Sequence, residues 1–222
     1  MKTMTFLSFA PGLIMFVIST ALNAAPSGEA IARQGNGKGA APCMSCHGDM
    51  NQSTAAAAYP SLSGQPSSYL VKQLEDFANK LRLNSVMQPM ASALSAEDIK
   101  AVTDYYASLP LSITSISQKE TAQATGGEAL AVNGKWSNGM PACFKCHGDK
   151  GQGVPPHFPA ISGQSSAYLK KQLQSWKRGE RNNDPVGLMQ AVAAQLSDGD
   201  IVNVAEYLAA QSATISKKPG VK

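Results

Sequence analysis

Charged residues, aromatic residues and alternating strand patterns are all scarce in this sequence. Charged residues make up 15% of the 222 residues and leave a formal net charge of +4, which excludes the dense Lys/Arg clusters of a nucleic-acid-binding protein. No segment alternates apolar and polar residues convincingly, so a β-sheet protein is not expected. The apolar content, in contrast, is 43%, which is typical of a globular protein and not of a disordered or fibrous one.

A long apolar run occurs at the N-terminus, from residues 6 to 18. Lys2 precedes this run, and small residues that include Ala24 and Ala25 follow it. A positively charged N-terminal region, a short apolar stretch and small residues at the cleavage site are typical of a secretory signal peptide. A membrane span, in contrast, needs about 20 apolar residues. We therefore expect residues 1–25 to be a cleavable signal peptide and the mature protein to be periplasmic. The alternative, an uncleaved anchor, would keep the protein associated with the membrane.

Cysteine is limited to four residues, and all four lie in two C-x-x-C-H runs. These runs consist of Cys43, Cys46 and His47 in the first half of the chain and Cys143, Cys146 and His147 in the second. Two thiols at this spacing can add to the two vinyl groups of one haem, and the following His then lies under the iron as an axial ligand. The runs therefore predict two covalently bound haem c groups.

Two other uses of these cysteines, zinc binding and disulfide formation, have to be weighed against haem. A four-cysteine zinc site places its pairs about 15 to 20 residues apart, whereas these pairs begin at positions 43 and 143. Redox-active disulfides need no His after each pair and expect a strand–helix context that the sequence lacks, while structural disulfides would suit an exported protein. The His that follows each pair favours haem over both alternatives.

The two halves of the chain are copies of one unit. Tyr59–Gln65 matches Phe158–Gln164, and Leu94–Ile99 matches Leu196–Ile201. The offset between matched positions runs from 99 residues (59 to 158) to 102 residues (94 to 196). We therefore expect a first domain at residues 26–110, a linker at 111–126, a second domain at 127–212 and a flexible tail at 213–222.

Each copy has the apolar spacing of helices, so the predicted fold class is all-α with two tandem domains. Short helices are expected before each Cys pair, and longer ones over residues 69–80 and 168–178. Ser95 and Ser197 are the predicted N-caps of the helix that closes each domain, because each has an Asp three residues later. Loops rich in Gly, Pro and Ser separate these helices.

The repeat also selects a second axial ligand for each iron. Met189 is the only Met after the second attachment run and lies eight residues before Ser197, and the same count back from Ser95 gives Met87. Met90 competes with Met87 but lies only five residues before the cap. The matched register in both halves favours iron binding over the filling of core gaps, which is a common use of Met.

The third His and two prolines complete the candidate site. His157 lies in a Pro-rich loop without a counterpart in the first half, so we expect it at the surface and not on iron. Pro60 and Pro159 follow the two C-x-x-C-H histidines by 13 and 12 residues. Because a ligating His donates its second N–H to an acceptor, we expect the carbonyls of these prolines to accept it. The alternative is that they are ordinary loop prolines.

These motifs together resemble class I cytochromes c, and in tandem they are similar to the di-haem cytochrome c4 family. The resemblance covers about residues 28–210 and rests on the C-x-x-C-H runs, the Gly-Gln…Tyr-Leu…Lys-Gln-Leu stretches, the Met loops and the Leu-Ser-x-x-Asp-Ile helices. It implies two class I domains, each wrapped around one covalent haem, whose haem edges approach near a pseudo-twofold axis. The iron ligands that it implies by position are His47 and Met87, and His147 and Met189. A shorter Met loop in the first domain departs from the family pattern.

The resemblance also implies an electron carrier in a respiratory chain, and not an enzyme. With both axial positions filled by protein, outer-sphere electron transfer towards a terminal oxidase is the expected role. The main alternative is a cytochrome subunit of a periplasmic dehydrogenase of the flavocytochrome type, followed by a di-haem peroxidase. The expected partners are redox proteins that donate and accept electrons, such as a membrane-bound oxidase or a bc-type complex. Neither nucleic acid nor a small-molecule substrate is expected.

Charge is distributed unequally between the halves. Residues 26–118 hold six Lys/Arg and seven Asp/Glu, a net charge of −1, whereas residues 119–222 hold twelve and eight, a net charge of +4. Five of the basic residues are close in sequence: Lys170, Lys171, Lys177, Arg178 and Arg181. A patch of one sign would steer docking to an acidic partner, and a solvated helix face is the alternative.

Overall fold

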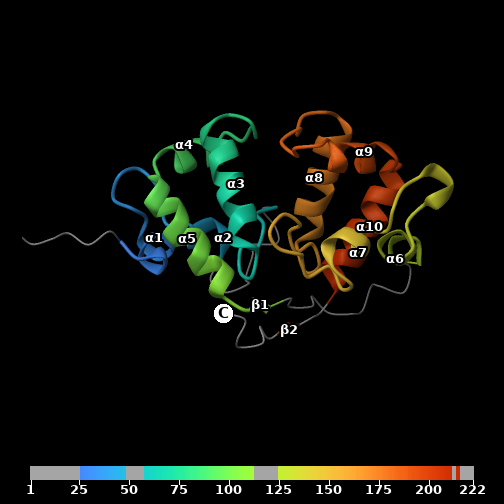
Figure 1. Ribbon diagram of the computed structural model, residues 1–222, viewed down its shortest axis with the longest axis horizontal. Coiled ribbons are helices and arrows are strands. Elements are labelled where there is room, and N and C mark those ends of the chain that lie inside the picture. Colours follow the sequence, from blue (N-terminus) through green and yellow to red (C-terminus); the bar gives the residue numbers. More distant parts are fainter. Residues whose placement is uncertain (1–25, 49–57, 113–124, 212–213, 216–222) are drawn as a thin grey trace, which may run out of the picture.

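The computed structural model describes residues 26–48, 58–112, 125–211 and 214–215. Two helical domains lie side by side, with α3 (Ser67–Ala78) and α8 (Ser166–Lys177) flanking the boundary between them (Figure 1). The predicted signal peptide and most of the predicted linker and tail lie outside the described residues. Within the described part of the chain, no helix is long and apolar enough to cross a membrane.

Both domains contain corresponding α-helices in the same order. The first domain has α1 (Gly28–Gln34), α2 (Met44–His47), α3, α4 (Met87–Ser92) and α5 (Ala96–Ser108). The second has α6 (Thr125–Val132), the 3-10 turn η3 (Trp136–Asn138), α7 (Cys143–His147), α8, α9 (Leu188–Ala194) and α10 (Asp198–Ala210). The prediction of an all-α fold with two tandem domains is confirmed. The short helices α4 and α9, which carry the candidate Met ligands, are not predicted from the sequence.

A short β pair joins the ends of the two domains. Strand β1 (Leu111–Ser112) runs antiparallel to β2 (Thr214–Ile215). No strand is expected from the sequence here, because residues 111–112 begin the predicted linker and residues 214–215 belong to the predicted tail. The pair brings the chain that leaves the first domain next to the chain that leaves the second.

The helix that closes each domain begins with the predicted capping box. The Ser95 hydroxyl accepts a hydrogen bond from the Asp98 amide at 3.1 Å, and the Asp98 carboxylate accepts one from the Ser95 amide at 3.2 Å. Ser197 and Asp200 repeat this exchange at 3.1 and 2.9 Å at the start of α10. These bonds satisfy backbone donors that the first turn of a helix leaves unpaired, so α5 and α10 begin at matching positions.

Two glycines allow the first helix of each domain to cross the last one closely. A Cβ built on Gly28 would lie 2.0 Å from the carbonyl oxygen of Ala101 in α5. A Cβ on Gly127 would lie 2.2 Å from the carbonyl oxygen of Asn203 in α10. Any side chain would therefore push the helices apart at both crossings. The buried apolar residues of α1 and α5, and of α6 and α10, pack around these contacts.

Candidate functional site

A cavity of about 490 Å³ lies between the helices and receives side chains from both domains. Its size falls within the usual range of ligand sites, roughly 300–1,000 Å³. Its walls contain all eight of the predicted haem-site residues: Cys43, Cys46, His47, Met87, Cys143, Cys146, His147 and Met189. Met90 also lines the cavity, whereas His157 does not and is exposed at the surface as predicted. Folding therefore brings the residues that the repeat selected together around one space.

The C-x-x-C-H runs form the short helices α2 and α7 on the cavity wall. The four thiols are free, so no structural disulfide joins them. Burial raises the pKa of Cys43, and it raises the pKa of Cys143 to about 11. Within the described residues, no three His, Cys, Asp or Glu side chains gather in a way that would hold a metal ion. The geometry therefore supports neither the disulfide nor the zinc alternative.

Both histidines are oriented by a proline carbonyl, as predicted. Nδ1 of His47 donates to the Pro60 carbonyl oxygen at 2.8 Å, and Nδ1 of His147 donates to that of Pro159 at 2.7 Å. Burial lowers the pKa of each imidazole and outweighs the carbonyl, which raises it. The rings are therefore neutral near pH 7, and Nε2 is the nitrogen that remains available as a lone-pair donor.

The backbone amide of each candidate Met is held by a polar side chain that the motifs and the repeat did not predict. Asn84 accepts a hydrogen bond from the Met87 amide at 2.9 Å, and Asp184 accepts one from the Met189 amide at 2.6 Å. These bonds fix the first turns of α4 and α9, where unpaired amides need acceptors. An Asn or Asp shortly before each Met is a signal in the sequence that could have revealed them.

Met90 is engaged differently from Met87. Its sulfur accepts a hydrogen bond from the Ala41 amide at 3.4 Å. A thioether sulfur is a weak acceptor, so this contact is modest in energy, but it ties the Met90 side chain to the loop before α2. Among the described residues, no such hydrogen bond is made to the sulfur of Met87.

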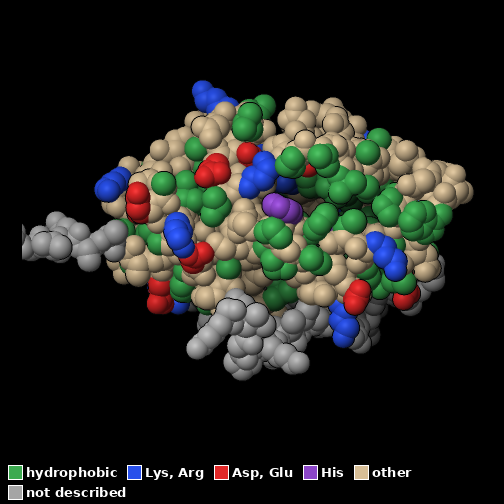
Figure 2. Space-filling model, viewed as in Figure 1, with side chains coloured by type: hydrophobic (Ala, Val, Ile, Leu, Met, Phe, Trp, Pro, Cys, Tyr) green, Lys and Arg blue, Asp and Glu red, His purple; other side chains and the backbone are tan. Residues whose placement is uncertain are grey.

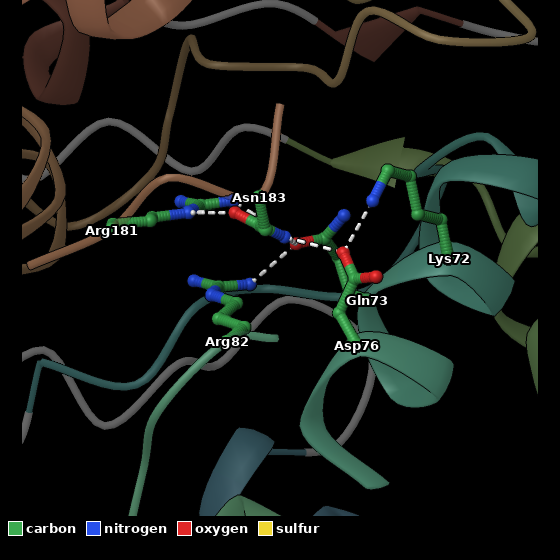
Figure 3. A network of polar contacts seen from close by, with 6 residues as sticks. All are labelled: Lys72, Gln73, Asp76, Arg82, Arg181 and Asn183. Carbon is green, nitrogen blue, oxygen red and sulfur yellow. Dashed lines mark hydrogen bonds and ion pairs between the residues drawn. The ribbon is translucent and has the colours of Figure 1, made fainter. Parts of the chain in front are cut away.

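A buried polar network crosses the domain boundary beside the cavity (Figure 3). Arg82 donates to Gln73 at 2.9 Å and to Gln172 of the second domain at 2.7 Å. Arg181 donates to the same two amide oxygens, at 3.0 Å to Gln73 and 2.7 Å to Gln172. Arg82 and Arg181 are separated by the repeat offset, as are Gln73 and Gln172, so the network follows a pseudo-twofold arrangement. Asn183 extends it by donating to Gln73 and Asp76.

This network has more cationic donors than anionic acceptors. Arg82 and Arg181 are 8% and 6% exposed, and their guanidinium groups also stack on Phe77 and Trp176, 4.6 and 3.9 Å from the ring centres. Burial, followed by the nearby Arg82, lowers the pKa of Arg181. Two buried cations this close require anionic partners, and Asp76 is the one carboxylate in the network described above.

A haem fits this donor set. The indole Nε1 of Trp176 is buried without a hydrogen-bond partner among the described residues, and Trp176, Arg82 and Arg181 all line the cavity. Haem carries two propionate carboxylates and an apolar ring, which match the unpartnered donor, the buried guanidinium groups and the largely apolar wall. The cavity therefore suits haem in polarity as well as in the placement of thiols and imidazoles.

The prediction of a basic patch of one sign on the second domain is wrong. Arg181 is buried at the domain boundary, and three of the other four residues form ion pairs: Lys170 with Glu206, Lys177 with Asp198 and Arg178 with Glu180. On the face shown in Figure 2, acidic and basic side chains are interspersed. Spacing along the sequence could not reveal these partners, since two of them, Glu206 and Asp198, come from α10.

Comparison with known proteins agrees with this geometry. Residues 127–212 match the family model "Cytochrome c", and residues 30–105 match the model "Cytochrome C oxidase, cbb3-type, subunit III". The chain is 43% identical to a thiosulfate dehydrogenase electron acceptor of Thiomonas intermedia, over 82% of this chain and 84% of that protein. It is 37% identical to cytochrome c4 of Pseudomonas aeruginosa, over 82% of this chain and 88% of that protein.

A solved structure has the same arrangement of domains. The thiosulfate dehydrogenase of Marichromatium purpuratum superposes with a TM-score of 0.77 at 36% identity, over 82% of this chain. The match spans only 39% of that longer chain. The family models cover both halves of the present sequence, and the cytochrome c4 relative covers most of it. The chain therefore belongs to the cytochrome c4 family of electron-transferring cytochromes, and it carries two covalently bound haem c groups.

Proposed function

We propose that each domain binds its haem through the residues that the repeat selected. The thioether attachments are at Cys43 and Cys46 in the first domain and at Cys143 and Cys146 in the second. The axial ligands are His47 and Met87 for one iron and His147 and Met189 for the other. These assignments rest on the proposed domains at residues 26–110 and 127–212, joined by a linker at 111–126.

The hydrogen bonds around the ligands carry this assignment. Because Nδ1 of His47 and of His147 is bonded to a proline carbonyl, Nε2 is the nitrogen available to iron. The amides of Met87 and Met189 are anchored by the side chains of Asn84 and Asp184, which lie three and five residues earlier in the chain. The Ala41 contact to the Met90 sulfur favours Met87 as the ligand of the first domain.

This ligand set suits a carrier and not a catalyst. When bound, each haem supplies a one-electron iron couple, and a thioether ligand shifts that couple to higher potential by favouring ferrous iron. With His and Met from the chain as the two axial ligands, each iron would have no coordination position left for a substrate. The buried Arg82 and Arg181 would hold the haem carboxylates at the domain boundary, and the largely apolar wall would limit the access of water.

We further propose that the protein acts in the periplasm, after removal of residues 1–25, as the electron acceptor of a thiosulfate dehydrogenase. The relative named for this activity and the fold shared with the Marichromatium purpuratum enzyme support this donor. A terminal oxidase is the proposed onward acceptor. This proposal combines the carrier role with the dehydrogenase-linked role.

Rapid-mixing absorbance measurements can test the donor. Oxidised holoprotein is mixed with a thiosulfate dehydrogenase, with and without thiosulfate, and the reduction of both haems is followed. Thiosulfate-dependent reduction within the turnover time of the enzyme is expected. If the same enzyme reduces its own acceptor but not this protein, the proposed donor is wrong, although the ligand assignment is unaffected.

A further inference from the structure

Two glutamine side chains, one from each domain, cross the domain boundary and hydrogen-bond to the backbone of the opposite domain. Gln65 of the first domain donates to the Ala160 carbonyl at 2.9 Å and accepts from the Ala160 amide at 2.9 Å. Gln164 of the second domain donates to the Ser61 carbonyl at 2.8 Å and accepts from the Ser61 amide at 2.9 Å. Both side chains are buried, with 3% and 4% exposure. Each glutamine therefore pairs both the backbone N–H and the backbone C=O of one residue in the opposite domain.

The backbone that each glutamine clasps is directly connected to a candidate iron ligand. The amide of Ala160 and the carbonyl of Pro159 belong to one peptide group, and that carbonyl accepts from His147. The Pro60–Ser61 peptide has the same role for His47. One planar peptide group therefore accepts from a histidine at its oxygen and donates to the other domain's glutamine at its nitrogen.

Hydrogen bonds at the two ends of a peptide group strengthen each other. When the amide N–H donates to a glutamine oxygen, the peptide is polarised and its carbonyl oxygen becomes a better acceptor. A better acceptor pulls more strongly on the imidazole N–H and makes the ring a more basic ligand, which favours the ferric state. The glutamine is thus in a position to lower the potential of the haem in the opposite domain.

The loops that carry the glutamines are fixed to their own domains. The Gly64 amide donates to the Tyr106 carbonyl at 2.8 Å, and the Gly163 amide donates to the Leu208 carbonyl at 2.8 Å. Each glycine has a φ of +72°, a left-handed conformation that glycine adopts without strain. The base of each glutamine is therefore held rigidly while its side chain reaches across the boundary.

We propose that Gln65 and Gln164 are positioning residues that set the reduction potential of the haem in the opposite domain. Gln65 acts on the second haem through the Pro159–Ala160 peptide. Gln164 acts on the first haem through the Pro60–Ser61 peptide. This inference rests on the proposed function, because it takes His47 and His147 as the iron ligands.

The test is an optical redox titration of holoprotein variants Gln65→Met and Gln164→Met, which keep side-chain length but lose both hydrogen bonds. The titration gives one reduction step, or wave, for each haem. Met87→His and Met189→His reference variants assign each wave to a domain, because replacing Met by His lowers the potential of that haem. Gln65→Met is expected to raise the potential of the second haem, with a roughly threefold change in its oxidised-to-reduced ratio at fixed ambient potential. Gln164→Met is expected to do the same to the first haem.

Ser68→Ala is the matched control. The Ser68 hydroxyl donates to the Pro156 carbonyl across the same boundary at 2.6 Å, but the peptide that it touches does not accept from a histidine. This variant loses an interdomain bond and is expected to leave both potentials unchanged. If Gln65→Met or Gln164→Met does not fold, Gln→Asn at the same position is used instead, because the Asn side chain is too short to reach the opposite backbone. It is expected to give the same shift in the potential of the haem in the opposite domain.

The crossed pattern separates the proposal from a structural role. A shift confined to the haem of the mutated domain, equal shifts of both haems, or no shift would overturn it. The wild-type protein is checked first for two haems and for His/Met ligation. Failure of that check would contradict the proposed function, whereas failure of the crossed shift in a correctly ligated protein would contradict only the role of the glutamines.

Discussion

The two domains share a scaffold but differ in the charges placed around it. In the first domain the amide of the candidate Met is held by a neutral Asn84, and in the second by the carboxylate of Asp184. The ring next to the proximal His is Tyr59 in the first domain and Phe158 in the second, each with its centre 6.0 Å from the imidazole. A repeated fold can thus hold two similar cofactors in unequal electrostatic surroundings, which would let the two haems differ in potential.

The comparison of the two domains depends first on the sequence alignment that pairs Met87 with Met189. Met87→Leu is expected to remove about half of the weak far-red thioether-to-iron absorption of the oxidised protein, because one of two Met–iron bonds is lost. Met189→Leu should do the same, and Met90→Leu should leave the band intact. A band of full intensity in Met87→Leu, together with a band of half intensity in Met90→Leu, would assign the ligand to Met90. That result would contradict the pairing of Met87 with Met189.

The helix crossings at Gly28 and Gly127 should be equally intolerant of a side chain. Gly28→Ala and Gly127→Ala are each expected to reduce the free energy of unfolding by about 1–3 kcal/mol, because a Cβ would meet backbone. Denaturant titration of the holoprotein measures this loss. Gly199→Ala is the control, since its Cβ would have no neighbour closer than 3.8 Å, and its effect should stay within about 0.5 kcal/mol. Tolerance at only one crossing would show that the domains pack differently.

Replacing either of the groups that hold the Met amides by its counterpart from the other domain should make the domains more alike. Asp184→Asn removes a carboxylate that accepts from the amide of the proposed ligand Met189. It is expected to raise the potential of the second haem by roughly 1 kcal/mol, or about a fivefold change in the oxidised-to-reduced ratio. Asn84→Asp should lower the potential of the first haem by a similar amount. Redox titration with assigned waves measures both shifts. Unchanged potentials in both variants would mean that these groups only anchor the helices.

The capping boxes provide the smallest expected difference. Burial raises the pKa of Asp98, but bonds from Asn36 and Ser95 outweigh it and the pKa is lowered. For Asp200, the ion pair with Lys135 is the largest of the causes that lower the pKa. A lowered folded-state pKa gives stability that is present above the ordinary value of 3.8 and is lost as the pH falls through the folded-state value.

Asp98→Asn and Asp200→Asn should therefore each cost about 1 kcal/mol of unfolding free energy near pH 7 and less below pH ~3. Denaturant titrations at the two pH values give the difference. A cost that stays the same at both pH values would show that the carboxylate charge does not contribute to either cap.

Local features of the fold and the site could be predicted, and features that depend on how the domains meet could not. The caps at Ser95 and Ser197 and the carbonyls of Pro60 and Pro159 follow from short-range patterns in each copy. The roles of Arg82 and Arg181 depend on side chains about 90 to 108 residues away in the chain, so spacing alone placed Arg181 wrongly on the surface. These interface residues do recur at the repeat offset, and that recurrence was the available signal.

An optical redox titration of the mature wild-type protein, recorded across the haem bands and the far-red thioether band, tests the central claim most directly. Two one-electron waves are predicted, with the thioether band present at two-haem intensity when fully oxidised and lost in step with both waves. A single wave that accounts for one haem, or an oxidised protein without the thioether band that binds carbon monoxide readily once reduced, would contradict a di-haem carrier with His47/Met87 and His147/Met189 ligation.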